Sequence, residues 1–161
     1  IRTLLAAAAA LVALPAFAHD GVHVEDVYAR SNGGIGGSGA VFLVVDNHQI
    51  EDDRLIGVTT DVAEKAELHT HKESADGVMQ MMAVPEGFVI PANDSHALAR
   101  GGDHIMLMGL KAPLKDGENV ALVLDFGDCG LIHIAVPVDN QRKPDAADAG
   151  GDHAGHGAMT H

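Results

Sequence analysis

From Val22 to Val138 the chain consists of short segments that are either apolar or alternate between apolar and polar residues. Clusters of Gly, Pro, Asn and Asp separate these segments. None of these segments sustains a 3.6-residue hydrophobic period, so the pattern predicts strands and turns rather than helices. Many short strands with regular turn signals are typical of an antiparallel β-sandwich or barrel, an all-β fold. The predicted strands are Val22–Ala29, Gly39–Asp46, Arg54–Thr59, Lys65–Thr70, Val78–Val84, Phe88–Ile90, His96–Leu98, His104–Gly109, Asn119–Asp125 and Leu131–Val138.

The N-terminal segment has a different character. Leu4–Leu14 is a continuous apolar run, and Ala16–Ala18 follows it with the small-x-small pattern that signal peptidase accepts. We therefore predict a signal peptide over residues 1–18 and an exported protein. The run is shorter than the roughly 20 residues that span a bilayer, so no stable membrane insertion is expected. No cysteine follows the cleavage pattern, which argues against a lipoprotein anchor.

The C-terminal segment lacks the residues that build a core. After Val138 no Val, Ile, Leu or Phe occurs, and Asp, Ala, Gly and His dominate the rest of the chain. Because so little apolar surface cannot offset the entropy of ordering, a disordered tail is predicted over residues 139–161. The folded domain is predicted over residues 19–138.

Composition and charge narrow the range of functions. The 161 residues suit a single domain, and 23 acidic against 10 basic side chains give a formal net charge of −13. Nucleic acids and anionic membranes require a positive face, so neither is an expected partner. Cys129 is the single cysteine, which excludes an intramolecular disulfide and a multi-cysteine zinc site.

Methionine and histidine are concentrated in one part of the chain. Five of the six methionines lie in Met79–Met108, a segment that begins soon after His69 and His71 and includes His104. On a strand, His104 and Met106 project to the same side, about 7 Å apart, and offer an imidazole and a thioether together. The predicted strands Lys65–Thr70 and Val78–Val84 can bring a second imidazole and a second thioether. Thioether sulfur is a soft, neutral ligand that prefers Cu(I) and adds little for Zn(II), Mg(II) or Ca(II).

Five short stretches resemble one known family. They are Glu67–His69, Gly77–Met81, Ile90–Ala92, Gly102–Leu110 and Pro113–Gly117. Together they resemble the periplasmic copper chaperone family PCuAC over most of residues 22–138. The resemblance implies a cupredoxin-like Greek-key β-sandwich in the periplasm that carries Cu(I) on two His and two Met and is not an enzyme. It also implies two partners, the copper-bearing subunit of cytochrome c oxidase and a thiol protein of the Sco type.

Carried over by position, the resemblance assigns the copper ligands. They are His69, Met81, His104 and Met106. The spacing from His69 to Met81 and that from Met81 to His104 are each one residue longer than in the family pattern. Counting strictly by the family spacing selects His71 and Met82 instead. Because the local motifs favour His69 and Met81, we place these first and keep Met79, His71 and Met82 as alternatives.

The two chain ends carry further donors that suit Cu(II). After cleavage, His19 would supply an amino group and an imidazole, with His23 nearby. The tail carries imidazoles and one thioether, which on a chain containing several glycines can wrap around the ion. These tail residues are His153, His156, Met159 and His161.

Two other functions fit much of the same pattern. A blue-copper electron carrier needs a Cys thiolate with two His and a weak axial Met. Cys129 and His133 are close in sequence, but no Met follows at short spacing, and the neighbouring Asp128 opposes thiolate formation. A copper storage or buffering protein would use the same soft donors without a delivery partner.

Overall fold

The computed structural model describes residues 21–31 and 33–143, so the predicted signal peptide and His19 lie outside the described part, as do the tail donors. This part consists of eleven strands and a short 3-10 helix, η1. Their bounds are β1 (Val22–Ser31), β2 (Ser38–Asn47), β3 (Asp53–Leu55), β4 (Gly57–Thr60), β5 (Ala63–Glu73), β6 (Met79–Ala83), β7 (Phe88–Ile90), β8 (Asp94–Leu98), β9 (His104–Leu110), β10 (Asn119–Asp125), η1 (Gly127–Cys129) and β11 (Leu131–Pro137).

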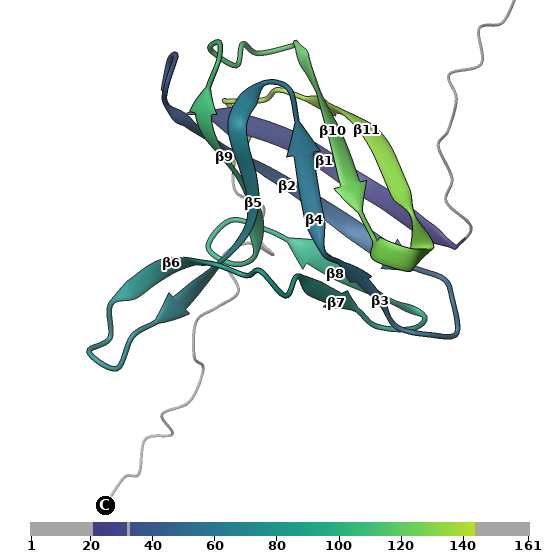
Figure 1. Ribbon diagram of the computed structural model, residues 1–161. Coiled ribbons are helices and arrows are strands. Elements are labelled where there is room, and N and C mark those ends of the chain that lie inside the picture. Colours follow the sequence, from purple (N-terminus) through teal and green to yellow (C-terminus); the bar gives the residue numbers. More distant parts are fainter. Residues whose placement is uncertain (1–20, 32, 144–161) are drawn as a thin grey trace, which may run out of the picture.

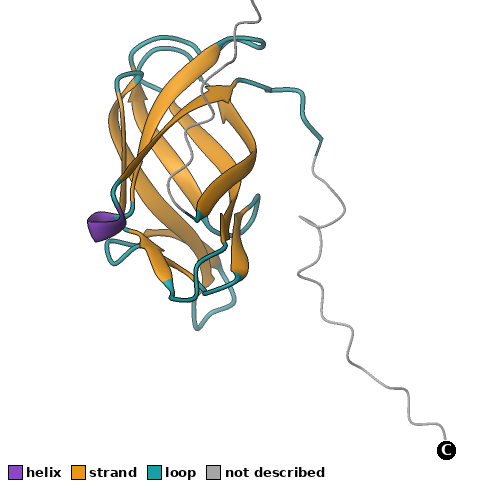
Figure 2. Cartoon of the chain, turned by 90° about the vertical axis from the view of Figure 1, so that its right-hand side faces the viewer, coloured by secondary structure: helices purple, strands orange, loops and turns teal. Residues whose placement is uncertain are grey.

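The strands form a sandwich of two main sheets (Figures 1 and 2). One six-stranded sheet has the order β1-β2-β9-β5-β6, with β8 pairing beside β2, and the facing sheet has the order β11-β10-β4. A two-stranded sheet of β3 and β7 lies at one end. The named strand pairs are antiparallel, and neighbours such as β2 and β9 are far apart in the chain. The predicted all-β, antiparallel sandwich is confirmed.

The core is mostly aliphatic and lies between the two sheets. Because side chains alternate along a strand, β9 turns Ile105 and Leu107 inward, and both are fully buried. Leu122 and Leu124 of β10 meet them from the facing sheet as part of the same cluster. The inner positions of β9 thereby fix which way its intervening residues point.

One predicted strand is wrong in detail. Arg54–Thr59 was expected to be a single strand, but the structure divides it into β3 and β4 at Ile56. The two halves pair with different partners, β3 with β7 and β4 with β10. Ile56 is 43% exposed between them. Because β3 and β4 pair in two separate sheets, the segment is divided even though its apolar pattern is continuous.

The β5–β6 hairpin extends beyond the sandwich (Figure 1). The prediction ended the first strand at Thr70, but β5 continues to Glu73 and pairs with β6 as far as Met79. All five residues of β6 are exposed. The hairpin therefore carries His71 past the edge of the sandwich core.

The predicted start of the disordered tail at Asp139 is also wrong. The backbone N–H of Asp139 donates to the carbonyl oxygen of Ala29 at 2.9 Å. The Asn140 side chain accepts from the N–H of Ser31 and donates to the carbonyl oxygen of Leu114. Polar bonds to distant parts of the chain, including those of Gln141 and Arg142, therefore keep residues 139–142 on the fold without apolar side chains. The described part contains no helix with the length and hydropathy needed to cross a membrane.

Candidate metal site

The outer face of the six-stranded sheet brings the predicted donors together. On β9, His104 and Met106 alternate with the inward Ile105 and Leu107, so both project outward. His104 lies directly opposite His69 of β5, and residues directly opposite in an antiparallel pair share a face. The two rings have their centroids 5.9 Å apart.

The register of β6 separates its methionines between the two faces. Met81 is paired with His71, and Met79 with Glu73, so both lie on the donor face. Met82 is paired with Thr70 and lies on the opposite face. Of these three methionines, only Met81 contributes to the cleft described below. Met82 is therefore poorly placed to act with His104.

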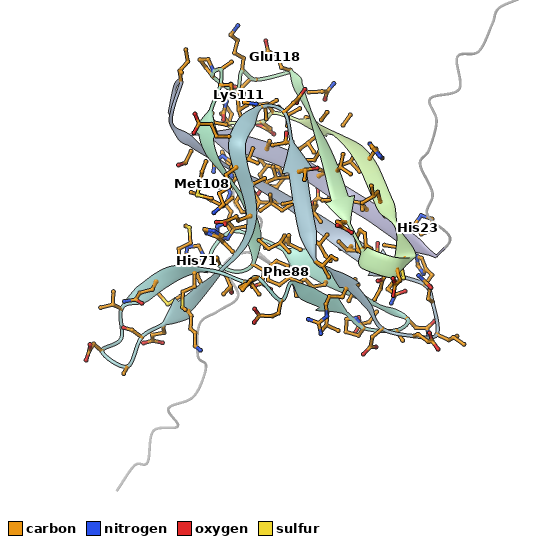
Figure 3. The ribbon with its side chains drawn as sticks, in the orientation of Figure 1. His23, His71, Phe88, Met108, Lys111 and Glu118 are labelled. Atoms are coloured by element: carbon orange, nitrogen blue, oxygen red, sulfur yellow. The ribbon has the colours of Figure 1, made fainter. Side chains whose placement is uncertain are left out.

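Four donor side chains line one cleft of about 240 Å³. They are His71, Met81, His104 and Met106. Ala40 of β2 lies opposite Met106, and its small side chain leaves the cleft open at that position. Figure 3 shows His71 and Met108 on the side of this sheet away from β10 and β11. Met108 does not line the cleft.

A single backbone carbonyl orients two of the imidazoles. His104 donates from Nδ1 to the carbonyl oxygen of Gly102 at 2.9 Å, and His71 donates to the same oxygen at 3.2 Å. This arrangement leaves the Nε2 lone pair of each ring for a metal ion, as in most metal-binding histidines. Burial lowers the pKa of His104, and the neighbouring rings lower it further, which keeps its imidazole neutral.

His69 lies beside the cleft and carries a buried nitrogen without a partner. Its Nε2 lies 3.1 Å from a carboxylate oxygen of Glu67, while its Nδ1 is buried with no hydrogen bond. Hydrogen bonds from Lys65 and His69 lower the pKa of Glu67, which keeps the carboxylate charged. A buried polar atom without a partner costs about 1–3 kcal/mol, and a metal bond to Nδ1 would remove that cost.

The donor set restricts which ions can bind. Among the described residues, no three His, Cys, Asp or Glu side chains are grouped closely enough to hold a metal ion. The other soft donors that line the cleft are the thioethers of Met81 and Met106. Imidazole and thioether ligands are neutral and soft, a combination that suits Cu(I).

The other predicted histidine in the described part, His23, lies elsewhere. Its ring packs edge-on against His48, with centroids 5.1 Å apart, at the far end of β1. His96 binds a carboxylate oxygen of Asp103 through Nε2 at 2.9 Å. These contacts place His23, His48 and His96 outside the cleft lining.

Cys129 sits in η1, on a different element from the cleft. Burial raises the pKa of its thiol, and the carboxylates of Asp53 and Asp128 raise it further. We therefore expect Cys129 to react with iodoacetamide at pH 8 more slowly in the folded protein than in urea, because less thiolate is present. Cys129→Ser should leave Cu(I) binding unchanged. Equal iodoacetamide rates in the two conditions would overturn the first expectation, and an intense blue absorption of the Cu(II) form that disappears in Cys129→Ser would overturn the second.

The sequence interpretation missed two cationic residues in the cleft wall. Arg30 of β1 and Arg100, which follows β8, both line the cleft. The shared acceptor Gly102 was not anticipated either. Arg100 and Gly102 are close to His104 in the sequence, and this proximity was the only sequence signal for their role in the cleft.

Comparison with known proteins places the chain in a family. The family model described as “Putative lipoprotein LpqE-like” matches residues 22–138. A relative from Leifsonia xyli subsp. xyli (strain CTCB07), named “Putative lipoprotein Lxx21020”, is 38% identical over 119 residues, which is 74% of this chain and 70% of the relative.

Solved structures share the fold. Those of apo-DR1885 and CuI-DR1885 from Deinococcus radiodurans are both 31% identical, with TM-scores of 0.56 and 0.55. The matches cover 87% and 73% of this chain, and 96% and 79% of the respective neighbours. The copper-bound PCuAC domain from PmoF2 has a TM-score of 0.58 at 20% identity, over 73% of this chain and 92% of that domain.

The fold and the cleft together define the class of protein, a cupredoxin-like β-sandwich with a His- and Met-lined cleft on the outer face of its larger sheet. Within that class, the chain belongs to the LpqE-like family of PCuAC proteins. The family resemblance carried by the sequence motifs is confirmed.

Proposed function

We propose that the protein is a periplasmic copper chaperone that binds one Cu(I) ion in the cleft. The observation that carries this proposal is the convergence of His104 and Met106 of β9 with Met81 of β6 on one cleft. The relatives support the choice of ion, since one solved neighbour is a copper-bound PCuAC domain and another is CuI-DR1885.

The chemistry of the donors supports carriage rather than permanent retention. Imidazole and thioether are neutral, so the bound Cu(I) keeps its single positive charge and no thiolate competes for it. Methionine needs no deprotonation and forms no disulfide in an oxidising compartment. A thiolate-bearing acceptor is then a stronger ligand and can take the ion.

We propose cytochrome c oxidase as the destination, with a Sco-type thiol protein assisting. The test mixes the Cu(I)-loaded protein with the apo copper-bearing domain of the oxidase, with and without the reduced Sco-type protein. Cu(I) bound to the separated oxidase domain is expected to accumulate faster than when chelated Cu(I) alone is supplied. Retention of all the copper by the chaperone would favour storage or buffering.

The second imidazole comes from β5, and we propose His69. Two observations support His69. Its Nδ1 is buried without a hydrogen-bond partner and is free to bind a metal ion, and the Glu67 carboxylate on Nε2 would orient the ring, as in many metal-binding histidines. His71 is the alternative, because it lines the cleft. His69→Ala should weaken Cu(I) binding by more than roughly 10–100-fold, which is the loss of affinity typical when a residue that only orients a metal ligand is removed.

The matched control for this assignment is His71→Ala on the same strand face. It should change Cu(I) affinity less than His69→Ala, as measured by competition with a Cu(I) chelator. Equal circular dichroism spectra of the two variants would exclude misfolding. A larger loss in His71→Ala would assign the ligand to His71.

A further inference from the structure

The cleft wall facing the donors is positively charged, although the chain as a whole carries a formal net charge of −13. Arg30 and Arg100 both line the cleft with His104 and Met106. A cationic wall beside a cation site is unfavourable for that cation, because like charges repel. The arrangement therefore calls for a second ligand of negative charge.

The position of Arg30 follows from strand register. Arg30 is paired with Ala40, and Ala40 with Met106, so the three lie in one row on the outer face. Neighbouring strands are about 4.8 Å apart, which places Arg30 two strand spacings from Met106. Between them, Ala40 has no side chain long enough to fill the space. The row thus runs from a guanidinium, across a gap, to a thioether.

Neither guanidinium has an acidic partner. No ion pair among the described residues includes Arg30 or Arg100. Each donates from one Nη2 to a backbone carbonyl, that of Asn140 for Arg30 and that of Arg142 for Arg100. The Nε–H of each is buried without a hydrogen-bond partner. Since guanidinium carries five N–H donors, most of the donor capacity at both residues is unused.

The second arginine lies near an aromatic ring. The Arg100 guanidinium carbon lies 5.8 Å from the ring centroid of Tyr28, and Tyr28 packs on Phe42 at 5.1 Å. Phe42 in turn lies 6.3 Å from the ring of His104, centroid to centroid. Both arginines are half-buried. Partial burial of this kind strengthens their attraction for an anion relative to that of a solvated side chain.

We propose that Arg30 and Arg100 form a carboxylate-binding subsite in the wall of the copper cleft. Planar guanidinium groups match the two oxygens of a carboxylate, and the hydroxyl of Ser38, which also lines the cleft, can donate a further hydrogen bond. The carboxylate comes from a small organic acid or from an acidic side chain of a polypeptide. The subsite itself is independent of copper.

The subsite is coupled to the metal, an extension that rests on the proposed function. A bound carboxylate offsets the positive charge beside the cleft, so it stabilises Cu(I) there, and by linkage Cu(I) strengthens carboxylate binding by the same factor. Loss of the carboxylate would then favour release of the ion. An acidic partner surface could use this coupling at the moment of transfer.

The first test uses the full chain without metal and two probes, sodium acetate and a capped tri-glutamate peptide. We expect saturable shifts of the backbone amide resonances of Gly101 and Ala40. Arg30→Gln and Arg100→Gln should each weaken binding about tenfold or more, the loss typical of a charge-assisted hydrogen bond. Tighter binding of the peptide than of acetate would assign the carboxylate to a polypeptide, and equal binding to a small acid.

Two further variants make this test specific. Arg54→Gln removes a guanidinium that bonds the Glu86 carbonyl outside the cleft, and it should leave probe binding unchanged. Arg30→Lys keeps the charge but loses the planar fork, so it should bind more weakly than the natural protein and more tightly than Arg30→Gln. Shifts that do not saturate, or that are equal in Arg30→Gln and Arg54→Gln, would overturn the subsite.

The second test measures Cu(I) affinity against a chelator with and without the tri-glutamate peptide. The peptide should raise affinity about fivefold or more in the natural protein and not in Arg100→Gln. No change in affinity would overturn the coupling. If the chain binds no Cu(I) at all, the proposed function fails, and the metal-free titration still decides whether the subsite exists.

Discussion

Met106→Leu is expected to remove tight Cu(I) binding while leaving the fold unchanged. Leucine has nearly the volume of methionine, and such exchanges usually cost less than about 1.5 kcal/mol of unfolding free energy. Leucine offers no sulfur, however, and Met106 is one of two thioethers that line the cleft. The loss in Cu(I) affinity should exceed the roughly 10–100-fold that follows removal of a residue that only orients a metal ligand. Competition with a chromogenic Cu(I) chelator measures it.

Met108→Leu is the matched control for this experiment. Met108 lies two residues along β9 on the same outer face but does not line the cleft, so Cu(I) affinity should be unchanged. His104→Ala should lose copper as Met106→Leu does. Equal Cu(I) affinities of Met106→Leu and Met108→Leu would disprove the cleft as the copper site.

Leu107→Ala is expected to reduce stability by about 2–5 kcal/mol of unfolding free energy, because it leaves a cavity in the core. Leu107 is fully buried on the inner face of β9, between the outward-facing Met106 and Met108. The folded fraction should still bind one Cu(I), since the substitution faces away from the cleft. Urea denaturation of the metal-free protein gives the change in free energy.

Leu131→Ala provides the comparison on stability. Leu131 is 56% exposed on β11, and its truncation should change the free energy by about 0.5 kcal/mol or less. A small effect at Leu107, or loss of Cu(I) from folded Leu107→Ala, would contradict the division of β9 into a structural face and a binding face.

Most of the strands could be predicted because their inner faces are apolar and turn residues mark their ends. Phe88–Ile90 and Asn119–Asp125 match the structure residue for residue. The division at Ile56 could not be predicted, because one apolar run serves two sheets. Residues 139–142 were also misjudged, since polar bonds to distant parts of the chain hold them and no local pattern shows this.

The placement of the site could be predicted only in part. The i, i+2 spacing put His104 and Met106 on one face, and the structure agrees. The extension of β5 that brings His71 to the cleft depends on pairing with β6, which no local pattern shows. The choice between His69 and His71 therefore stayed open.

The arginine wall was hidden by an irregularity of β1. The pairing shifts by one residue between Glu25 and Tyr28, and Asp26 at this bulge has a φ of 48°. A one-residue insertion exchanges the faces of all later residues in the strand. Simple alternation from the buried Val22 would have turned Arg30 inward, whereas the bulge turns it toward the cleft.

The carbonyl of Gly102 serves both His71 and His104, which come from different strands. One peptide group in the β8–β9 turn is thus a common anchor, and Asp103 beside it is tied to His96. Any displacement of this turn would rotate two imidazoles at once rather than one. A partner that grips the turn would move the proposed ligand His104 and the neighbouring His71 in a single step without touching either ring.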